Sequence, residues 1–333
     1  MPPERGLPSR SRGAALISIG LLLLAGIAAY AGIGPVTHAL AALGALGLAV
    51  ITVMHLPVIL AMGLAWWCIG RGHARLGAFV AARLGRDAVA EVMPLSQIGG
   101  FLAGARLLTL AGTPAPRAAS SLFADLIAEF AAKLVYTLLG LAVLAWILPG
   151  AGLIRPFGIA LAAAGAAFAA AVLFYGRFKL ALQNFAARAA RKFIAVPSGG
   201  LDVADVFTSW GILPSFVLHL ICWLFGAVEA WIMLRLMGLA VSGGQAFVID
   251  SLATAFRSLG FLLPASLGVQ EAGYVLVCAL FGLTPAAAVA FSLGRRARDI
   301  LIGLLGLVVW QRMEWRPRST RSQPQPDTPL WRG

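Results

Sequence analysis

The sequence predicts an all-α polytopic integral membrane protein with about eight membrane elements. Hydrophobic residues make up 60% of the 333 residues and charged residues only 12%, about half the charged fraction of ordinary soluble domains. The mean hydropathy is +0.89. Several uncharged runs also reach the length of about 20 residues that an α-helix needs to span a bilayer. A soluble globular fold is therefore excluded.

The basic charge of the chain indicates contact with lipid rather than with nucleic acid. Lys and Arg number 26 and Asp and Glu number 13, which gives a net charge of +13. The basic residues gather mostly in short connectors and at the two termini, as expected for cytoplasmic loops that face anionic lipid. We therefore expect membrane lipids as partners and no nucleic acid.

The first membrane elements are predicted from uncharged runs and from the arginines beside them. Residues 1–13 are basic and should stay in the cytoplasm, and the run 14–34 is long enough for a first crossing. A second crossing occupies about 46–70, after an interfacial or re-entrant segment. Residues 71–87 form a predicted cytoplasmic connector because they carry four arginines: Arg71, Arg75, Arg83 and Arg86.

Two further crossings are predicted at about 118–148 and 156–176, separated by a short Pro-Gly loop. Residues 177–193 are basic on one side and apolar on the other. This pattern is typical of a helix that lies on the surface of a membrane leaflet. We place that helix on the cytoplasmic side.

The last part of the membrane domain is harder to divide. Residues 212–238 and 245–263 predict a fifth and a sixth crossing, whereas 264–311 is apolar but interrupted by prolines, glycines and the stretch RRARD. It can form a re-entrant segment and one long crossing, or it can split into two crossings. The membrane domain is thus expected to cover 14–311, and the polar tail 312–333 is expected to be disordered.

Two interrupted stretches predict an internal repeat. Residues 94–114 (PLSQIGGFLAGARLLTLAGTP) and 264–285 (PASLGVQEAGYVLVCALFGLTP) both begin Pro-x-Ser, contain a glycine-bearing break and end with Gly before Thr-Pro. Each apolar part is too short to span a bilayer and suits a re-entrant half-helix. Broken helices of two repeated halves commonly surround the binding site of secondary transporters. The repeat therefore predicts two re-entrant or broken segments around one cavity.

Ionisable residues within apolar segments are candidates for a substrate path. Each costs about 2.5–3.5 kcal/mol at the membrane centre, so such residues persist mainly when they are paired or face water. Asp125, Glu129 and Lys133 lie four residues apart on one helical stripe. Either Glu129 and Lys133 neutralise each other, or the three side chains form a polar wall of the path.

Arg257 and Glu271 flank the break at Pro264 and Gly268. Arg257 is placed to hold an anionic or polar headgroup, with Glu271 as its partner in the resting state. The alternative is an Arg257–Glu271 ion pair with a structural role only. Asp250 lies on the same helix face as Arg257 but too far along the axis for direct pairing, so the two are expected to share a cavity.

Two interpretations remain open for the other charged residues. Arg106 and the arginines at 295–298 either anchor the chain at the cytoplasmic surface or meet phosphate or carboxylate groups inside the cavity. The four histidines are scattered without ligand spacing, so we assign them no chemistry and expect no metal site. The predicted substrate-path residues are Arg106, Asp125, Glu129, Lys133, Glu229, Asp250, Arg257, Pro264, Gly268, Glu271, Arg295, Arg296, Arg298 and Asp299.

Enzymatic signatures are missing from the sequence. It contains no HExxH, GxSxG, P-loop or dinucleotide-binding pattern. We therefore expect no cofactor, and a transporter rather than an enzyme.

The quoted stretches, together with FADLIAE at 123–129 and FGLTPAAAVAFSLGRRARD at 281–299, resemble the transmembrane region of lysylphosphatidylglycerol synthases. This superfamily is also described as flippase-like or UPF0104. The likeness covers about residues 14–311 and is strongest at 257–299. Within the superfamily it is greatest to the hopanoid-biosynthesis-associated membrane proteins of the HpnL type.

The resemblance implies a multi-pass protein of the bacterial inner membrane that moves or accommodates lipids. The implied partners are hopanoids or anionic phospholipids, and lipid biosynthesis or export proteins. Members that charge phosphatidylglycerol with lysine carry a large soluble catalytic domain after the membrane region, whereas this sequence ends in a short tail, so aminoacyl transfer is not expected. The family's two sequence patterns fall on Pro264, Gly268 and Glu271 and on Arg295, Arg296 and Arg298.

Three functions remain under consideration. The leading hypothesis is a lipid flippase or transporter whose two broken repeats form a lateral groove, with charged residues accepting the polar end of a lipid. The second is a non-transporting scaffold that holds lipid biosynthesis enzymes at the membrane. The third and weakest is a lipid-modifying transferase that uses Asp125 or Glu271 as a base.

Overall fold

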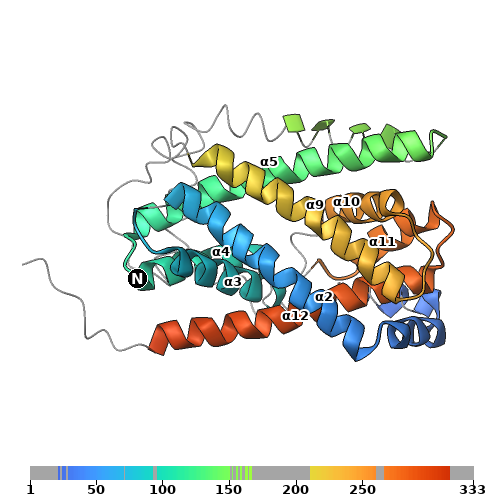
Figure 1. The fold of residues 1–333 in the computed structure, drawn as a ribbon, viewed down its shortest axis with the longest axis horizontal. Coiled ribbons are helices and arrows are strands. Elements are labelled where there is room, and N and C mark those ends of the chain that lie inside the picture. The colour runs from blue at the N-terminus through green and yellow to red at the C-terminus, as the bar shows by residue number, and fades with distance from the viewer. Residues whose placement is uncertain are drawn as a thin grey trace, which may run out of the picture.

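The described part of the chain is built from α-helices, as Figure 1 shows. No strand occurs within these residues, which confirms the predicted all-α class. The computed structural model describes residues 22, 25–27, 29–70, 72–92, 96–150, several positions between 152 and 166, 211–259 and 266–315.

Eight helices form two halves with the same order of one long, two short and one long helix. The first half contains α2 (Ile33–Gly70), α3 (Leu76–Val92), α4 (Ser96–Leu110) and α5 (Ala115–Ile147). The second half contains α9 (Ile212–Leu236), α10 (Gly243–Leu259), α11 (Val269–Ala279) and α12 (Pro285–Trp315). In each half the second short helix is followed by a glycine in the left-handed region: Gly112 (φ 99°) after α4 and Gly282 (φ 71°) after α11. The order of elements therefore supports the predicted repeat.

The two halves run in opposite directions. In Figure 1, α2 and α9 cross side by side with opposed chain directions, and α3–α4 lie at one end of the molecule while α10–α11 lie at the other. Contacts agree, because Val58 of α2 meets Cys222 of α9, whereas the earlier Gly47 faces the later Leu236. The arrangement is an inverted repeat, which recurs in membrane transporters.

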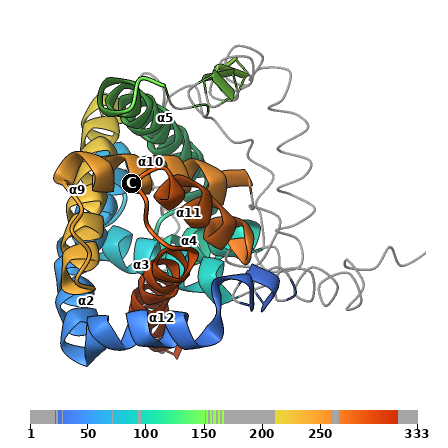
Figure 2. The same ribbon diagram turned by 90° about the vertical axis from the view of Figure 1, so that its right-hand side faces the viewer.

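Each half is completed by the long helix of the other half. α12 packs against α2 and α3, and α5 packs against α9 and α10. Viewed from the end, α5, α9, α2 and α12 form an arc around the four short helices (Figure 2). The main apolar core lies between α2 and the second half and includes Leu43, Met233, Leu252 and Phe291.

Three of the described helices, α2, α5 and α9, are long and apolar enough to cross a membrane. The protein is therefore a multi-pass membrane protein. The helices α5 and α9 match the predicted crossings 118–148 and 212–238. α2 contains a break at Gly44 (φ 61°, ψ 177°), and this agrees with the expected interruption before the crossing at 46–70.

Several predicted boundaries are wrong. Residues 71–87 are not a surface connector, because α3 begins at Leu76 and buries Arg83 and Arg86 to 4% and 5% exposure. α10 has 17 residues rather than the length of a full crossing. The region 285–311 forms one continuous helix, so the division into two crossings is not adopted, and α12 extends to Trp315 inside the predicted disordered tail.

Other predictions lie outside the described residues. These are the basic segment 1–13, most of the crossings 14–34 and 156–176, the surface helix 177–193, residues 316–333 and Pro264.

The α3–α12 interface gives a test of the packing between halves. A Cβ at Gly306 would overlap the Leu84 carbonyl and approach Ala88 Cβ to 2.8 Å, whereas a Cβ at Gly303 would meet Ala88 at an ordinary 3.6 Å. We expect Gly306→Ala to destabilise the protein by about 1–3 kcal/mol through overpacking. Gly303→Ala is the matched control and should be neutral or stabilising, since alanine is the better helix former. Thermal unfolding in detergent measures both, and equal midpoints would contradict this packing.

Candidate functional site

Among the described residues, acidic side chains are concentrated inside the helix bundle rather than on its surface. Eight of the 13 acidic residues make ion pairs with interior arginines. Isolated charges at membrane depth are costly, so each must find a partner or water. The pairs form three groups, which we name after their helices and position.

The α3–α5 group consists of Arg83, Arg86, Asp87, Asp125 and Glu129. Arg83 donates from its two terminal nitrogens to the two oxygens of Glu129, both at 3.1 Å, and from Nε to Asp87 at 2.8 Å. Arg86 donates to Glu129 at 2.7 Å and to Asp125 at 3.4 Å. Bidentate contacts of this kind combine two parallel charged hydrogen bonds and fix the geometry of the pair. The group therefore attaches the short helix α3 rigidly to α5.

His219 of α9 joins the α3–α5 group. Its Nε2 lies 2.9 Å from Asp125 Oδ1, its side chain is fully buried, and its Nδ1 has no hydrogen-bond partner among the described residues. Asp125, Glu129 and His219 offer ligand atoms within 4.8 Å of one another. The guanidinium groups of Arg83 and Arg86 already neutralise these carboxylates, so the electrostatics favour ion pairing over binding of a metal cation.

Lys133 is not the principal partner of Glu129, contrary to the predicted ion pair. Glu129 is bound by two arginines, and the Lys133 ammonium lies 4.9 Å from the centre of the Trp223 ring. A cation over an aromatic face is stabilised by the ring quadrupole. The predicted Glu129–Lys133 pair is therefore replaced by a larger group, in which α3 supplies the arginines that bind Glu129.

The central group connects five helices. Glu229 of α9 accepts from His55 of α2 at 2.9 Å and from Arg298 of α12 at 2.7 Å. Arg298 also donates to Asp299 at 2.7 Å, and Asp299 accepts from Arg257 of α10 at 3.4 Å. Arg257 in turn bonds Glu91 of α3. The members of the central group are His55, Glu91, Glu229, Arg257, Arg298 and Asp299.

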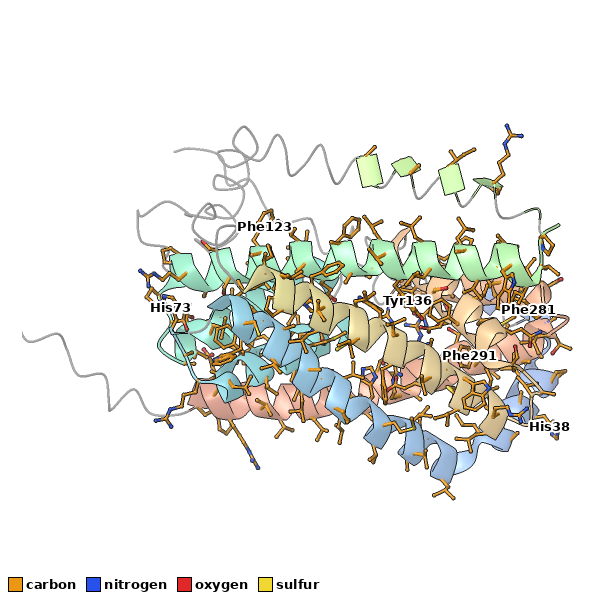
Figure 3. All side chains as sticks on the ribbon, turned by 45° about the horizontal axis from the view of Figure 1, so that its top comes forward. His38, His73, Phe123, Tyr136, Phe281 and Phe291 are labelled. Carbon is orange, nitrogen blue, oxygen red and sulfur yellow. The ribbon has the colours of Figure 1, made fainter. Side chains whose placement is uncertain are left out.

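The α12 group consists of Asp250, Glu271, Arg295 and Arg296. Arg295 bonds Asp250, which also accepts from Tyr136 of α5 at 2.7 Å. Arg296 donates to Glu271 at 2.8 Å. Figure 3 shows Tyr136 and Phe291, whose ring lies under Arg295, within the interior between the long helices.

Glu271 is held by its surroundings as well as by Arg296. The Glu271 carboxylate accepts from Ser292 at 3.0 Å and from the backbone N–H of Gly268 at 2.8 Å, and Glu271 is fully buried. The bond to Gly268, whose φ of 79° suits glycine, caps the first turn of α11. The break at Gly268 thus presents a helix N-terminus to a carboxylate.

The partners predicted across this break are different from those observed. Arg257 pairs with Glu91 and Asp299, and Glu271 pairs with Arg296, so the predicted Arg257–Glu271 pair is wrong. Asp250 and Arg257 do not pair directly, as expected, and they belong to different groups.

The arginines at 295–298 are not surface anchors. Arg295, Arg296 and Arg298 reach Asp250, Glu271 and Glu229 in the interior. Arg106 is different, because it pairs with Glu314 at 2.8 Å where both side chains are partly exposed, at 28% and 41%. The structure thus separates Arg106 from the other candidates.

The predicted site omits six residues that the structure places in or beside the ion groups, two of them histidines: His55, Arg83, Arg86, Asp87, Glu91 and His219. The signal for α3 was present in the spacing of Arg83, Arg86 and Asp87, which places them on one face of a helix. His55 and His219 carry no comparable local signal, since their carboxylate partners lie 174 and 94 residues away.

The sign of the charges is reversed between the two halves in the α3–α5 and α12 groups, whereas the Arg257–Asp299 pair of the central group has the opposite arrangement. In the first half the short helix α3 carries arginines and the long helix α5 carries carboxylates. In the second half the short helices α10 and α11 carry carboxylates and the long helix α12 carries arginines. Both halves therefore contribute arginines and carboxylates to the interior.

The bidentate contact predicts that two ion pairs contribute very differently to the free energy of unfolding. Glu129→Gln leaves Arg83 and Arg86 without their shared counterion and should lower the free energy of unfolding by about 3–5 kcal/mol. Arg106→Gln removes the partly exposed pair with Glu314 and should cost less than about 1 kcal/mol. Unfolding curves in detergent compare the two variants. Similar losses for both would show that Glu129 is not the buried counterion.

Comparison with known proteins places the chain in a family. The family model described as the lysylphosphatidylglycerol synthase transmembrane region matches residues 15–306. Neither curated proteins nor solved structures gave a significant match. The matched range contains every member of the three ion groups. With an inverted pair of helical halves and a match over most of its length, the chain belongs to the lysylphosphatidylglycerol synthase transmembrane-region family.

Proposed function

We propose that the protein moves lipids across the membrane in which it lies, as a flippase or transporter. The observation that carries the proposal is the inverted repeat, whose broken segments surround three buried ion groups. Inverted halves allow one half to rock against the other around a fixed site.

Ion groups of this kind suit the passage of a headgroup because they can exchange partners. Arg296, Glu271 and Ser292 form one small set of donors and acceptors beside the N-terminus of α11. A lipid phosphate can replace Glu271 as the partner of Arg296, and a lipid hydroxyl or ammonium group can replace Arg296 as the partner of Glu271. The lipid tails would remain in the bilayer during this exchange.

The substrate class follows from the mixed charge of the site. A hydroxylated hopanoid suits a path that offers both carboxylates and arginines, whereas an anionic phospholipid favours the arginines alone. We propose the hopanoid because the sequence stretches quoted above resemble those of HpnL-type proteins. We further propose the bacterial inner membrane as the location, with the N-terminus in the cytoplasm.

The scaffold and the transferase are less favoured alternatives. Asp125 and Glu271, the bases proposed for a transferase, are both engaged by arginines. A scaffold for biosynthesis or export proteins would need only the outer surface, so its activity would not depend on the interior pairs.

Reconstituted liposomes test transport directly. A labelled hydroxylated hopanoid and a labelled phosphatidylglycerol are placed in one leaflet, and their appearance in the other is followed. The double variant Glu271→Gln/Arg296→Gln removes both charges of a buried pair and leaves no uncompensated charge. We expect it to slow exchange by about tenfold or more, equivalent to a loss of about 1.4 kcal/mol in barrier lowering.

The matched control is Arg106→Gln/Glu314→Gln, which removes the partly exposed pair between α4 and α12 and should leave exchange unchanged. Equal exchange in wild type, double variant and protein-free liposomes would overturn the transport proposal and favour the scaffold. Formation of a new lipid product from a donor would instead favour the transferase.

A further inference from the structure

His55 lies at the junction of the two halves and contacts a buried carboxylate. It belongs to α2, and its Nδ1 lies 2.9 and 3.1 Å from the two oxygens of Glu229 on α9. Because Glu229 accepts, Nδ1 carries the hydrogen and donates it. The second ring nitrogen, Nε2, is then the position where a further proton can bind. The His55 side chain is 16% exposed, against 2% for Glu229.

The central group lacks one positive charge. Within the described residues, its three carboxylates, Glu91, Glu229 and Asp299, form ion pairs with two guanidinium groups, Arg257 and Arg298. Arg295 and Arg296 lie near this group but pair with the carboxylates of the α12 group. A proton on His55 would make the described members of the group neutral, and burial at membrane depth favours neutrality.

The neighbouring groups do not show this deficit within the described residues. The α3–α5 group has three carboxylates and two arginines, and Lys133, which is not one of its members, stands one helical turn from Glu129 and supplies the third positive charge. In the α12 group, two carboxylates meet two arginines. The unmatched charge therefore belongs to the group that contains His55.

His219 is the other histidine beside a carboxylate, but it is less suited to gain a proton. Its side chain is fully buried, and its Nδ1 has no hydrogen-bond partner among the described residues. A proton there would create a buried N–H donor without an acceptor, which costs about 1–3 kcal/mol. His219 therefore donates from Nε2 to Asp125, and its Nδ1 is not proposed as a proton site.

The helices packed against α2 set the electrostatic surroundings of His55. α9 contributes Glu229, and α12 contributes Arg298 and Asp299. α3 contributes Glu91, which reaches the group through Arg257 of α10, together with Arg83 of the adjacent group. α5 contributes the remaining charged side chains, Asp125, Glu129 and Lys133.

We propose that His55 is the site where a proton binds and couples to lipid movement. This inference rests on the proposed transport function and adds its energy source. With the proton bound, imidazolium and Arg298 both hold Glu229 and tie α2 to α9. When Nε2 loses the proton to water, the central group gains an unmatched negative charge and the contact between the halves weakens. The proton thus sets how firmly the two halves are joined.

Nuclear magnetic resonance of the full chain tests the proton site without relying on transport. The protein contains four histidines, and ¹⁵N labelling distinguishes imidazole from imidazolium in lipid nanodiscs. Over about pH 5–8, where histidine commonly changes charge, we expect one signal to interconvert between the two forms and to disappear in His55→Gln. His219→Gln should leave this signal in place, and His38→Gln and His73→Gln, at opposite ends of the molecule (Figure 3), serve to assign the others.

Liposomes with a pH difference across the membrane test the coupling. The measured quantity is the ratio of lipid exchange with the pH difference to exchange without it. We expect a ratio different from one in wild type and in His219→Gln, and a ratio of one in His55→Gln. A signal from His55 that keeps one form throughout the titration, or an unchanged ratio in His55→Gln, would overturn the inference. If wild type moves no lipid under either condition, the transport proposal fails, and the titration of His55 alone then decides whether the proton site exists.

Discussion

Pairing of arginines with carboxylates inside an apolar bundle is the constraint on which the rest of this structure depends. A single guanidinium or carboxylate at membrane depth is costly, and a pair recovers that cost only with good geometry and additional hydrogen bonds. The bidentate Arg83–Glu129 contact and the capping of α11 by Glu271 meet both conditions. Because the partners come from different helices, the pairs also determine which helices must lie together.

The inverted repeat distributes the ion pairs over both halves of the molecule. Each long helix packs against the short helix of the other half, α5 against α10 and α12 against α3, and small residues allow the close approach at Gly140 and Gly306. Both halves contribute arginines and carboxylates to the interior, so charges of both signs lie between the long helices. His55 and Glu229 meet where α2 crosses α9, which is the contact between the two halves. A change of charge at this contact reaches both halves at once.

Much of the candidate site could be predicted from local pattern, whereas its partners could not. Charged residues in apolar runs identify Asp125, Glu229 and Arg298 as residues that need an explanation, and the Pro-x-Ser and Gly-Thr-Pro signatures identify the repeat. The predicted partners were wrong where the contact joins residues that are far apart in the sequence. Arg83 and Arg86 resembled a cytoplasmic anchor because a loop arginine and a buried arginine look alike until the carboxylate of another helix is placed beside them.

The sequence by itself determined the membrane class, the long helices α5 and α9, the short interrupted segments and the family, because apolar length and helix-breaking residues are local properties. Only the tertiary structure decided that the halves are inverted, that Glu271 pairs with Arg296 instead of Arg257, and that His55 meets Glu229. The physical reason is that electrostatic pairing acts through space. Residues 25 to 174 positions apart become partners only after packing of the helices brings their side chains within hydrogen-bond distance.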